Sequence, residues 1–295
     1  MSLDRLAPAI FVLLWSTGWV VAKFGAIVSE PLTFLSIRYV VAAVLFAGLC
    51  LAARAEWPRD PRTILHALVS GAFLHGLYLG AVWWAIGAGV PAALSSVIAA
   101  LQPLMTALAA PFFVGERLSG AQKAGIGLGF LGVLIAVVPK LLGVGPDAVP
   151  VFAVLVNVVG MAAVTYGTIY QKQHLHTGDI RAIATLQYGG ALVVTLPFAL
   201  SLESLHVDWG IGFFALLAWS VLGISMGAIL LLLYLLRRGQ VSRAASLIYL
   251  VPPIAALQAA AIFGEALTVP MILGTVIVVI GVYLTNRRAE PPPAE

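Results

Sequence analysis

Long apolar stretches, separated by short polar or Pro- and Gly-containing breaks, follow one another along the whole chain. Each stretch has about 20 residues, the length at which a helix crosses the ~30 Å hydrocarbon core of a bilayer. Polar and apolar residues do not alternate with a period of two, which argues against a membrane barrel. The pattern therefore predicts an all-α integral membrane protein with ten transmembrane helices, at about residues 6–28, 33–53, 64–88, 92–114, 121–138, 150–171, 181–201, 209–236, 242–263 and 268–286.

The second half of the chain repeats the first at a distance of 149 residues. Residues 101–132 align with residues 250–281, and the match extends to the first helix of each half. Because five helices make up each half, equivalent helices cross the membrane in opposite directions, as in transporters built from inverted repeats. We expect one repeat over residues 1–149, a second over 150–288, and a disordered tail over 289–295. The matched positions include Lys23 with Lys172, Tyr39 with Tyr188, Pro103 with Pro252, Glu116 with Glu265, Gly125 with Gly274 and Gly132 with Gly281.

Composition agrees with a membrane protein and narrows the possible partners. The chain is 61% hydrophobic and 9% charged, against about 25% charged residues in a soluble domain. Its net charge is +4, but the basic residues are scattered at helix ends, so we expect the lipid bilayer and no nucleic acid as a partner. One cysteine, Cys50, excludes an internal disulfide and any paired-cysteine metal site. We expect no cofactor and no metal, and the chain is compatible with a monomer.

The distribution of Lys and Arg predicts the orientation in the membrane. With the N-terminus inside, Lys23 and Lys140 lie on the outer side and Arg38 lies inside the second helix. We therefore expect a multi-pass protein of the inner (plasma) membrane with both termini cytoplasmic. Thirteen of the sixteen basic residues then fall in cytoplasmic segments: Arg5, Arg54, Arg59, Arg62, Arg117, Lys123, Lys172, Arg181, Arg237, Arg238, Arg243, Arg287 and Arg288.

Two prolines fall near the middle of equivalent helices. Pro103 and Pro252 each remove a backbone donor and free the carbonyl four residues back, which is Ala99 in the case of Pro103. Such groups are tolerated in a membrane where they are buried in protein or face a water-filled cavity. The prolines therefore indicate either broken helices that contact a substrate or act as hinges, or kinks that serve packing.

No Asp or Glu falls inside a predicted span, although carboxylates are the usual proton relays of transporters. Glu116 and Glu265 are expected at opposite membrane faces, in a structural role near helix starts, with a capping box at Ser119–Gln122 and a cap at Thr268. The absence of buried acids disfavours carboxylate-coupled drug/proton antiport and leaves facilitated diffusion open. His75 is the remaining titratable group at depth, with either a structural role or a role in binding substrate or protons.

Two basic residues lie within the apolar helices. Lys23 can extend its side chain to the membrane interface. Arg38 needs a partner or water, and either attracts a substrate carboxylate or pairs with Glu30.

Aromatic and small polar side chains recur on single faces of several predicted helices. Such faces are typical of a cavity for a flat or apolar solute, although Trp and Tyr also form interfacial belts and Ser and Thr also join helices. We assign Trp15, Trp57 and Trp209 to a belt. The candidate cavity residues are Ser16, Trp19, His75, Tyr78, Ser95, Ala99, Gln102, Pro103, Tyr166, Ser246, Tyr249 and Pro252.

Two strings that resemble enzyme motifs lie inside predicted membrane helices. Gly127–Gly132 fits a dinucleotide-binding pattern but follows no strand, so close helix packing through Gly125 and Gly129 explains it better. Gly223–Gly227 fits a nucleophile-elbow pattern without the strand-to-helix turn that the motif requires. We therefore expect no enzymatic activity.

Three segments together resemble a known family: LLWSTGWVVAK at 13–23, PLTFLSIRYVVAA at 31–43, and LQPL followed by GERLSGAQKAGIGLGFLG at 115–132. They are similar to EamA-type members of the drug/metabolite transporter superfamily, and most similar to YddG-type exporters of aromatic amino acids. The resemblance implies a ten-helix basket in which helices 1–4 and 6–9 line a central cavity and helices 5 and 10 pack outside.

The residues themselves favour a secondary transporter of small amphipathic solutes that works by alternating access. Amino acids with aromatic or apolar side chains, and the direction of export, are what the resemblance implies. A substrate ammonium would meet carbonyls freed near Pro103 and Pro252, and its carboxylate would meet a half-helix N-terminus, His75 or Arg38. The alternatives are an exporter of drugs or other metabolites and, from different classes, a membrane scaffold or an intramembrane enzyme.

Overall fold

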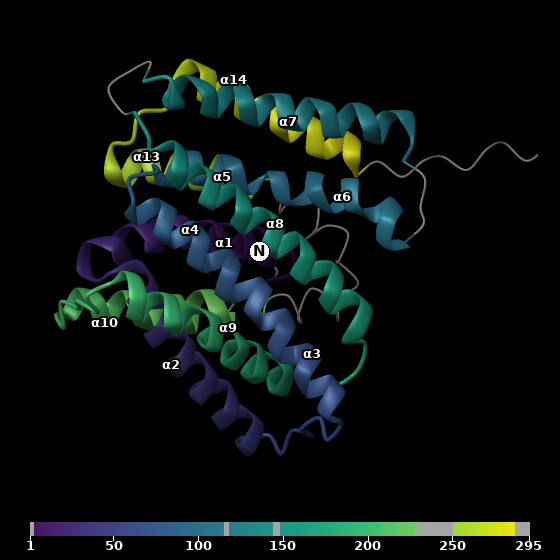
Figure 1. Ribbon diagram of the computed structural model, residues 1–295, viewed down its shortest axis with the longest axis vertical. Helices are drawn as coiled ribbons and strands as arrows, with labels where there is room; N and C mark the ends of the chain where they lie inside the picture. Colours follow the sequence, from purple (N-terminus) through teal and green to yellow (C-terminus); the bar gives the residue numbers. More distant parts are fainter. Residues whose placement is uncertain (1–2, 115–117, 144–147, 228–230, 232–249, 287–295) are drawn as a thin grey trace, which may run out of the picture.

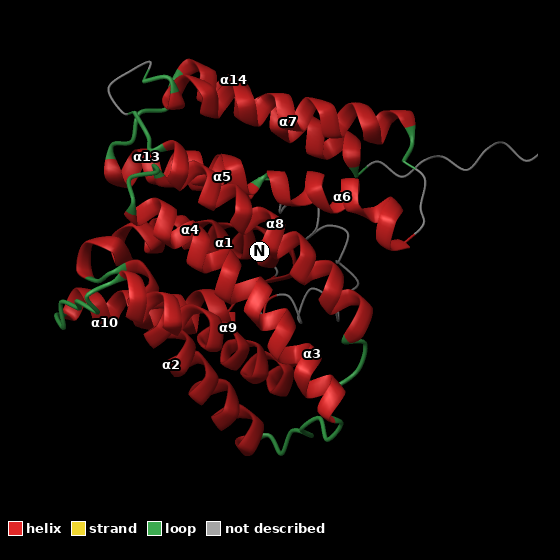
Figure 2. Cartoon of the chain, viewed as in Figure 1, coloured by secondary structure: helices red, strands yellow, loops and turns green. Residues whose placement is uncertain are grey.

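The computed structural model describes residues 3–114, 118–143, 148–227, 231 and 250–286, and these form helices without a regular strand (Figures 1 and 2). Ser29 and Val207 form one isolated antiparallel bridge. The helices are α1 (Leu3–Val28), α2 (Pro31–Ala52), α3 (Pro61–Gly71), η1 (Ala72–Leu77), α4 (Tyr78–Gly87), α5 (Ala92–Ala99), α6 (Leu101–Val114), α7 (Gly120–Leu141), α8 (Val151–His174), α9 (Ile180–Leu202), α10 (Ile211–Ala218), η2 (Trp219–Gly227), α13 (Val251–Phe263) and α14 (Val269–Thr285).

The described helices follow the predicted spans closely. Within the described residues, seven helices are long and apolar enough to cross a membrane, and three shorter apolar helices cover Ile211–Gly227, Val251–Phe263 and Val269–Thr285. The predicted spans 209–236 and 242–263 extend into residues 228–230 and 232–249, which lie outside the described residues, as does Glu116.

Several helices begin where their sequence predicts. Ser119 and Gln122 form the expected capping box at the start of α7, with backbone-to-side-chain bonds of 2.9 and 3.2 Å. Asp60 and Asp179 accept from the first backbone amides of α3 and α9. The prediction of a side-chain cap at Thr268 was wrong, because Thr268 precedes α14 with extended backbone and makes no capping hydrogen bond.

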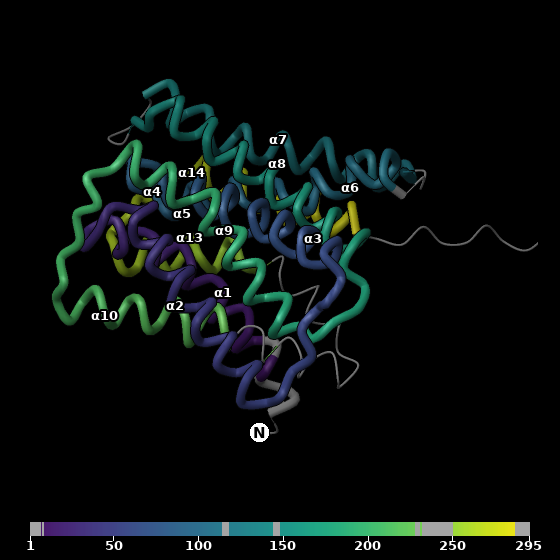
Figure 3. Tube along the Cα trace, turned by 60° about the horizontal axis from the view of Figure 1, so that its bottom comes forward, coloured from purple at the N-terminus to yellow at the C-terminus, as the bar shows by residue number. Residues whose placement is uncertain are grey.

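Helices α7 and α14 pack against each other along one side of the bundle (Figures 1 and 3). A Cβ at Gly125 would lie 2.6 Å from the Gly281 carbonyl oxygen, and a Cβ at Gly132 would lie 2.7 Å from that of Gly274. The helices therefore run antiparallel with their backbones in contact. Gly129 is held against Leu104 of α6, so close packing accounts for the glycine pattern in α7.

Two π-helical segments lie about 149 residues apart in the sequence. Shifting Ala72–Leu77 (η1) by 149 residues gives 221–226, which lies inside η2 (Trp219–Gly227). A π-helical turn re-aims the side chains that follow it and is frequent at functional sites. The backbone of the η1 region packs closely on α9, where a Cβ at Gly76 would lie 3.1 Å from the Ala191 carbonyl oxygen.

Candidate functional site

A cavity of about 420 Å³ lies inside the bundle. Its walls come from α1, α2, η1, α4, α5, α6, α8, α9, η2, α13 and α14. The lining is mainly aromatic and aliphatic, with a small number of polar groups, which is the composition typical of a site for a small organic molecule. The polar or titratable lining residues are Arg38, His75, Tyr78, Gln102, Thr168, Gln171, Gln187, Tyr188, Ser225 and Thr275.

The structure brings most of the predicted site residues to this cavity. The lining includes Trp19, His75, Tyr78, Ala99, Gln102, Pro103 and Pro252. Trp15, which we assigned to an interfacial belt, also lines it. Ser246 and Tyr249 lie outside the described residues.

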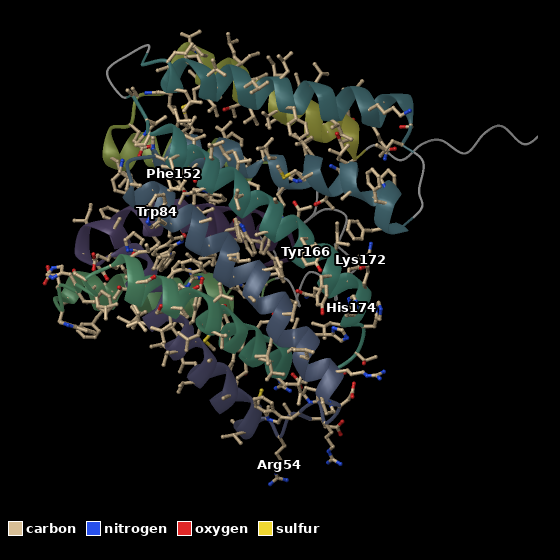
Figure 4. The ribbon with its side chains drawn as sticks, in the orientation of Figure 1. Arg54, Trp84, Phe152, Tyr166, Lys172 and His174 are labelled. Atoms are coloured by element: carbon tan, nitrogen blue, oxygen red, sulfur yellow. The ribbon has the colours of Figure 1, made fainter. Side chains whose placement is uncertain are left out.

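The cavity lining does not include three of the predicted residues, Ser16, Tyr166 and Ser95. The Ser16 hydroxyl is buried and donates to the Leu13 carbonyl of its own helix at 2.8 Å. Tyr166 is 41% exposed on α8 and contacts the ring of Phe73, on the side of the bundle seen in Figure 4. Neither residue is therefore retained in the proposed site.

Ser95, the third of these residues, is buried elsewhere in the bundle. The helix of the fourth span stops at Ala99 and restarts at Leu101, so Gln102 lies on a different helix from Ser95 and Ala99. Ser95 accepts a hydrogen bond from Asn157 Nδ2 at 2.8 Å and is fully buried, whereas Ala99 and Gln102 line the cavity.

The break follows from Pro103, which has no N–H to give to the Ala99 carbonyl. The amide of Ala100 instead bonds Val97 O at 3.1 Å, which closes a tighter turn. In the second half of the chain, Pro252 and Pro253 fall in the first turn of α13, where the missing donors cost little. The Ser96 hydroxyl donates a hydrogen bond to the Pro252 carbonyl at 3.1 Å and so links α5 to α13.

Arg38 is the charged residue among the cavity-lining side chains. It is 5% exposed, and its Nη2 donates to the Ser225 hydroxyl at 3.1 Å. Its guanidinium carbon lies 5.9 Å from the ring centre of Trp83. The expected pairing with Glu30 is not formed, because the Glu30 carboxylate accepts from Ser204 and His206 instead.

Stacked rings form the wall beside Arg38. His75 stacks on Tyr188 with ring centres 4.9 Å apart, and Tyr188 also contacts its repeat equivalent Tyr39 at 6.0 Å. The Tyr39 hydroxyl donates to the His75 carbonyl at 2.8 Å. This arrangement fixes the π-helical segment that carries His75 against α2 and α9, so the wall is preorganised.

One end of the bundle, which we call the Glu30 end, is joined by carboxylates that reach between the halves of the chain. Glu265 forms an ion pair with Lys23 and accepts from the amides of Ala92 and Ala93 at 3.0 and 2.8 Å. Lys23 therefore reaches the end of the bundle, where its ammonium is paired with a carboxylate. Glu265 is structural as expected, but it caps α5 rather than the helix that follows it.

Glu203 and Glu30 make similar links at the same end. Glu203 accepts from the amides of Leu32 and Thr33, at the start of α2, at 2.8 and 2.7 Å. Glu30 accepts from the amides of Ser204 and His206 at 3.1 and 2.8 Å. Partial desolvation would raise the pKa of Glu30, but these hydrogen bonds outweigh it and lower that pKa below its usual value.

The opposite end, which we call the Asp179 end, is held by local bonds. Arg181 donates to the Asp179 carboxylate through Nε at 2.9 Å and lowers the pKa of Asp179 to about 2. Gln187 and Gln171 bond at 3.0 Å between α9 and α8, and both line the cavity. The lining also includes Ile180, the first residue of α9, so the cavity extends toward this end.

Sequence reasoning missed several lining residues. Trp83 and Gln187 belong to helices that are apolar on more than one face, so no periodicity singled them out. Tyr188 was noticed as a repeat match and not as a wall of the cavity. Ser225 was considered within an enzyme-like string, whereas its hydroxyl donates to Ser220 O at 3.2 Å and accepts from Arg38.

Comparison with known proteins covers almost the whole chain. The model of the EamA-like transporter family matches residues 6–138 and 151–287. A probable amino-acid metabolite efflux pump of Escherichia coli K12 is 28% identical over 95% of this chain and 94% of its own. An uncharacterized transporter of Bacillus subtilis, YvbV, is 26% identical over 98% and 93%. A crystal structure that is 20% identical covers 97% of this chain and 98% of its own with a TM-score of 0.64, which supports the fold alone.

Proposed function

Because the chain belongs to the EamA-like transporter family, and is therefore a membrane transporter, we propose that it exports small amphipathic solutes. The proposed substrates are amino acids with aromatic or apolar side chains. The observation that carries the proposal is the central cavity, in which Trp19, Tyr78 and Tyr188 provide flat apolar surfaces beside a few polar groups. The name of the Escherichia coli relative, an amino-acid metabolite efflux pump, points to the same substrate class.

The proposed mechanism is alternating access between two inverted repeats, residues 1–149 and 150–288, with ten transmembrane helices in all. Three reciprocal features support the repeats. Gly125 meets Gly281 while Gly132 meets Gly274, Tyr39 contacts Tyr188, and the π-helical segments occupy equivalent positions. Contacts of this kind are expected when equivalent elements are related by a two-fold axis.

We place the protein in the inner membrane as a monomer, with both termini cytoplasmic. The Glu30 end then faces outward, and its cross-repeat hydrogen bonds keep that side shut while the cavity extends toward the Asp179 end. Export would require the links at the Glu30 end to open. We propose facilitated diffusion as the simplest energy coupling, because no Asp or Glu lies among the described cavity-lining residues.

Uptake by proteoliposomes tests the proposed function. Vesicles containing the purified protein should accumulate labelled phenylalanine, tryptophan and leucine faster than empty vesicles, and an imposed pH gradient should not be required. Unlabelled substrate should reduce the signal, because the 420 Å³ cavity holds one such molecule at a time. Absence of flux for every amino acid would contradict the proposal.

A second panel addresses the rival within the same class, an exporter of drugs or other metabolites. Lipophilic cationic dyes are the informative probe, because the charged lining residue is a cation that would repel them. We expect no dye transport. Dye transport without amino-acid transport would favour the rival, and the absence of any flux would favour a scaffold.

A further inference from the structure

We propose that Arg38 is the anchor for a carboxylate group, so that the site selects solutes carrying a carboxylate on an apolar or aromatic body and does not require their ammonium. This inference rests on the proposed transport function and names the chemical group that the cavity recognises. It is carried by the placement of one buried cation whose hydrogen-bonding capacity is largely unused.

The guanidinium is short of partners. Arginine has five N–H donors, and among the described residues Arg38 makes one hydrogen bond, from Nη2 to Ser225. Its Nε is buried and has no hydrogen-bond partner. Trp19 Nε1, in another wall of the same cavity, is also buried without a partner. A buried donor without an acceptor costs free energy, and an entering acceptor would recover that cost.

Among the described residues, no carboxylate forms an ion pair with Arg38. The described ion pairs are Lys23 with Glu265 and Arg181 with Asp179, and neither involves Arg38. Glu30 and Glu203 are bonded to backbone amides at the Glu30 end. Residues 228–249, next to Ser225 in sequence, contain no Asp or Glu. A cation in this low-dielectric setting therefore favours an anionic ligand.

The shape of the site suits a carboxylate. A guanidinium matches a planar carboxylate through two parallel hydrogen bonds, and Ser225 together with the Trp83 ring holds Arg38 in place. His75 and Tyr188 provide stacked rings in the same cavity, against which an aromatic body can pack.

The other anion acceptors that the sequence suggested are weaker. The first turn of α13 contains Pro252 and Pro253, which have no N–H, so this half-helix offers few donors to an anion. His75 is stacked on Tyr188 and would have to be protonated to provide charge. For the ammonium of an amino acid, the described cavity lining offers neutral backbone carbonyls and no negatively charged partner. One of them is the carbonyl of Ala99, which receives no helical hydrogen bond from Pro103 because proline has no N–H. The carboxylate therefore dominates recognition.

Matched ligands test the anchor in the wild-type protein. 3-Phenylpropanoate has the carboxylate without the ammonium, and phenethylamine has the ammonium without the carboxylate. We expect 3-phenylpropanoate to compete with labelled phenylalanine and to quench the fluorescence of cavity tryptophans such as Trp19, and phenethylamine to bind about 10- to 100-fold more weakly. The reverse order of affinity would overturn the proposal.

Variants identify the residue. Arg38→Gln should weaken 3-phenylpropanoate binding by about 10- to 100-fold while leaving phenethylamine binding unchanged. The affinity of Arg38→Lys for 3-phenylpropanoate should lie between those of the wild type and Arg38→Gln, because lysine keeps the charge but cannot form two parallel hydrogen bonds. Arg62→Gln, an exposed charge at the start of α3, is the matched control and should behave as wild type. Equal loss of both ligands with an unchanged melting temperature would show that Arg38 is not a carboxylate anchor.

The readouts separate the two proposals. Fluorescence quenching measures binding without transport, so selective binding of 3-phenylpropanoate in a protein that moves no amino acid would refute the proposed function and keep the anchor. Phenylalanine flux that is unaffected by Arg38→Gln would keep the function and refute the anchor. If Arg38→Gln does not fold, the wild-type ligand series decides the question.

Discussion

At the scale of single residues, the charged side chains within the bundle fall into two groups with different chemistry. At the Glu30 end, Lys23 and Glu265 satisfy each other, and Glu265 also accepts two backbone amides of α5. In the cavity, Arg38 has a neutral hydroxyl as its acceptor. Paired charges hold helices together, whereas a buried charge without a counter-ion is a candidate for function.

Replacing Glu265 with Ala should destabilise the folded protein. The change leaves Lys23 without its partner and exposes two backbone donors at the start of α5, a loss of about 1–2 kcal/mol by analogy with helix caps. Thermal unfolding in detergent measures the effect. Glu56→Ala, in an exposed loop, is the matched control. Equal melting temperatures for the two variants would contradict the proposed role of Glu265.

At the scale of helices, irregular turns position the cavity-lining residues, and glycines allow α7 and α14 to approach each other closely. The break at Ala100 directs Ser95 and Gln102 to different environments, and η1 and η2 bring His75 and Ser225 to the cavity. Helices α7 and α14, by contrast, are continuous α-helices, and their close contact depends on glycines, which have no side chain, at the contact points.

Alanine at Gly132 should therefore be costly and alanine at Gly127 should not. A Cβ at Gly132 would lie 2.7 Å from Gly274 O and 2.8 Å from Val278 N, whereas a Cβ at Gly127 has nothing within 4 Å. We expect Gly132→Ala to lower stability by about 1–3 kcal/mol through overpacking and Gly127→Ala to leave it unchanged or slightly raised. Melting temperatures in detergent compare them. Equal destabilisation of the two variants would contradict the packing explanation, because a Cβ at Gly127 meets nothing and alanine favours the helix.

At the scale of the whole molecule, hydrogen bonds between the two halves of the chain join the helix ends at the Glu30 end. Ser29 and Val207 form an antiparallel bridge. Two backbone hydrogen bonds flank it: Glu30 N donates to His206 O at 3.2 Å, and Asp208 N donates to Val28 O at 2.8 Å. The two residues are thus a non-hydrogen-bonded pair, in which side chains approach most closely. The loop after α9 is in this way attached to the turn between α1 and α2 (Figure 3).

A disulfide between Ser29→Cys and Val207→Cys, in a Cys50→Ala background, should lock this end. The close pairing meets the distance requirement of a disulfide. If transport requires the Glu30 end to open, oxidation should reduce flux to background and reduction should restore it. Each single-cysteine variant should be insensitive to oxidant. Full flux in the cross-linked protein would contradict alternating access through this end.

The sequence by itself determined the helices, the membrane setting and the family resemblance. These depend on runs of apolar residues and on local signals such as the Ser119 capping box, and local physics does not need the rest of the chain. The family match confirms the resemblance, while the repeats and the ten-helix count stay proposals. Arg38 was identifiable from sequence as a charge in need of a partner.

Only the tertiary structure decided which partners these residues have. Glu265 reaches Lys23 and α5 across 242 and more than 170 positions of chain, and Ser225 reaches Arg38 across 187, which no local pattern encodes. Apolar helices are also alike on many faces, so periodicity could not separate the wall residues Trp83 and Tyr188 from the lipid-facing surface. The physical reason is that packing between distant segments, and the breaks at Ala100 and in η1, set the direction of each side chain.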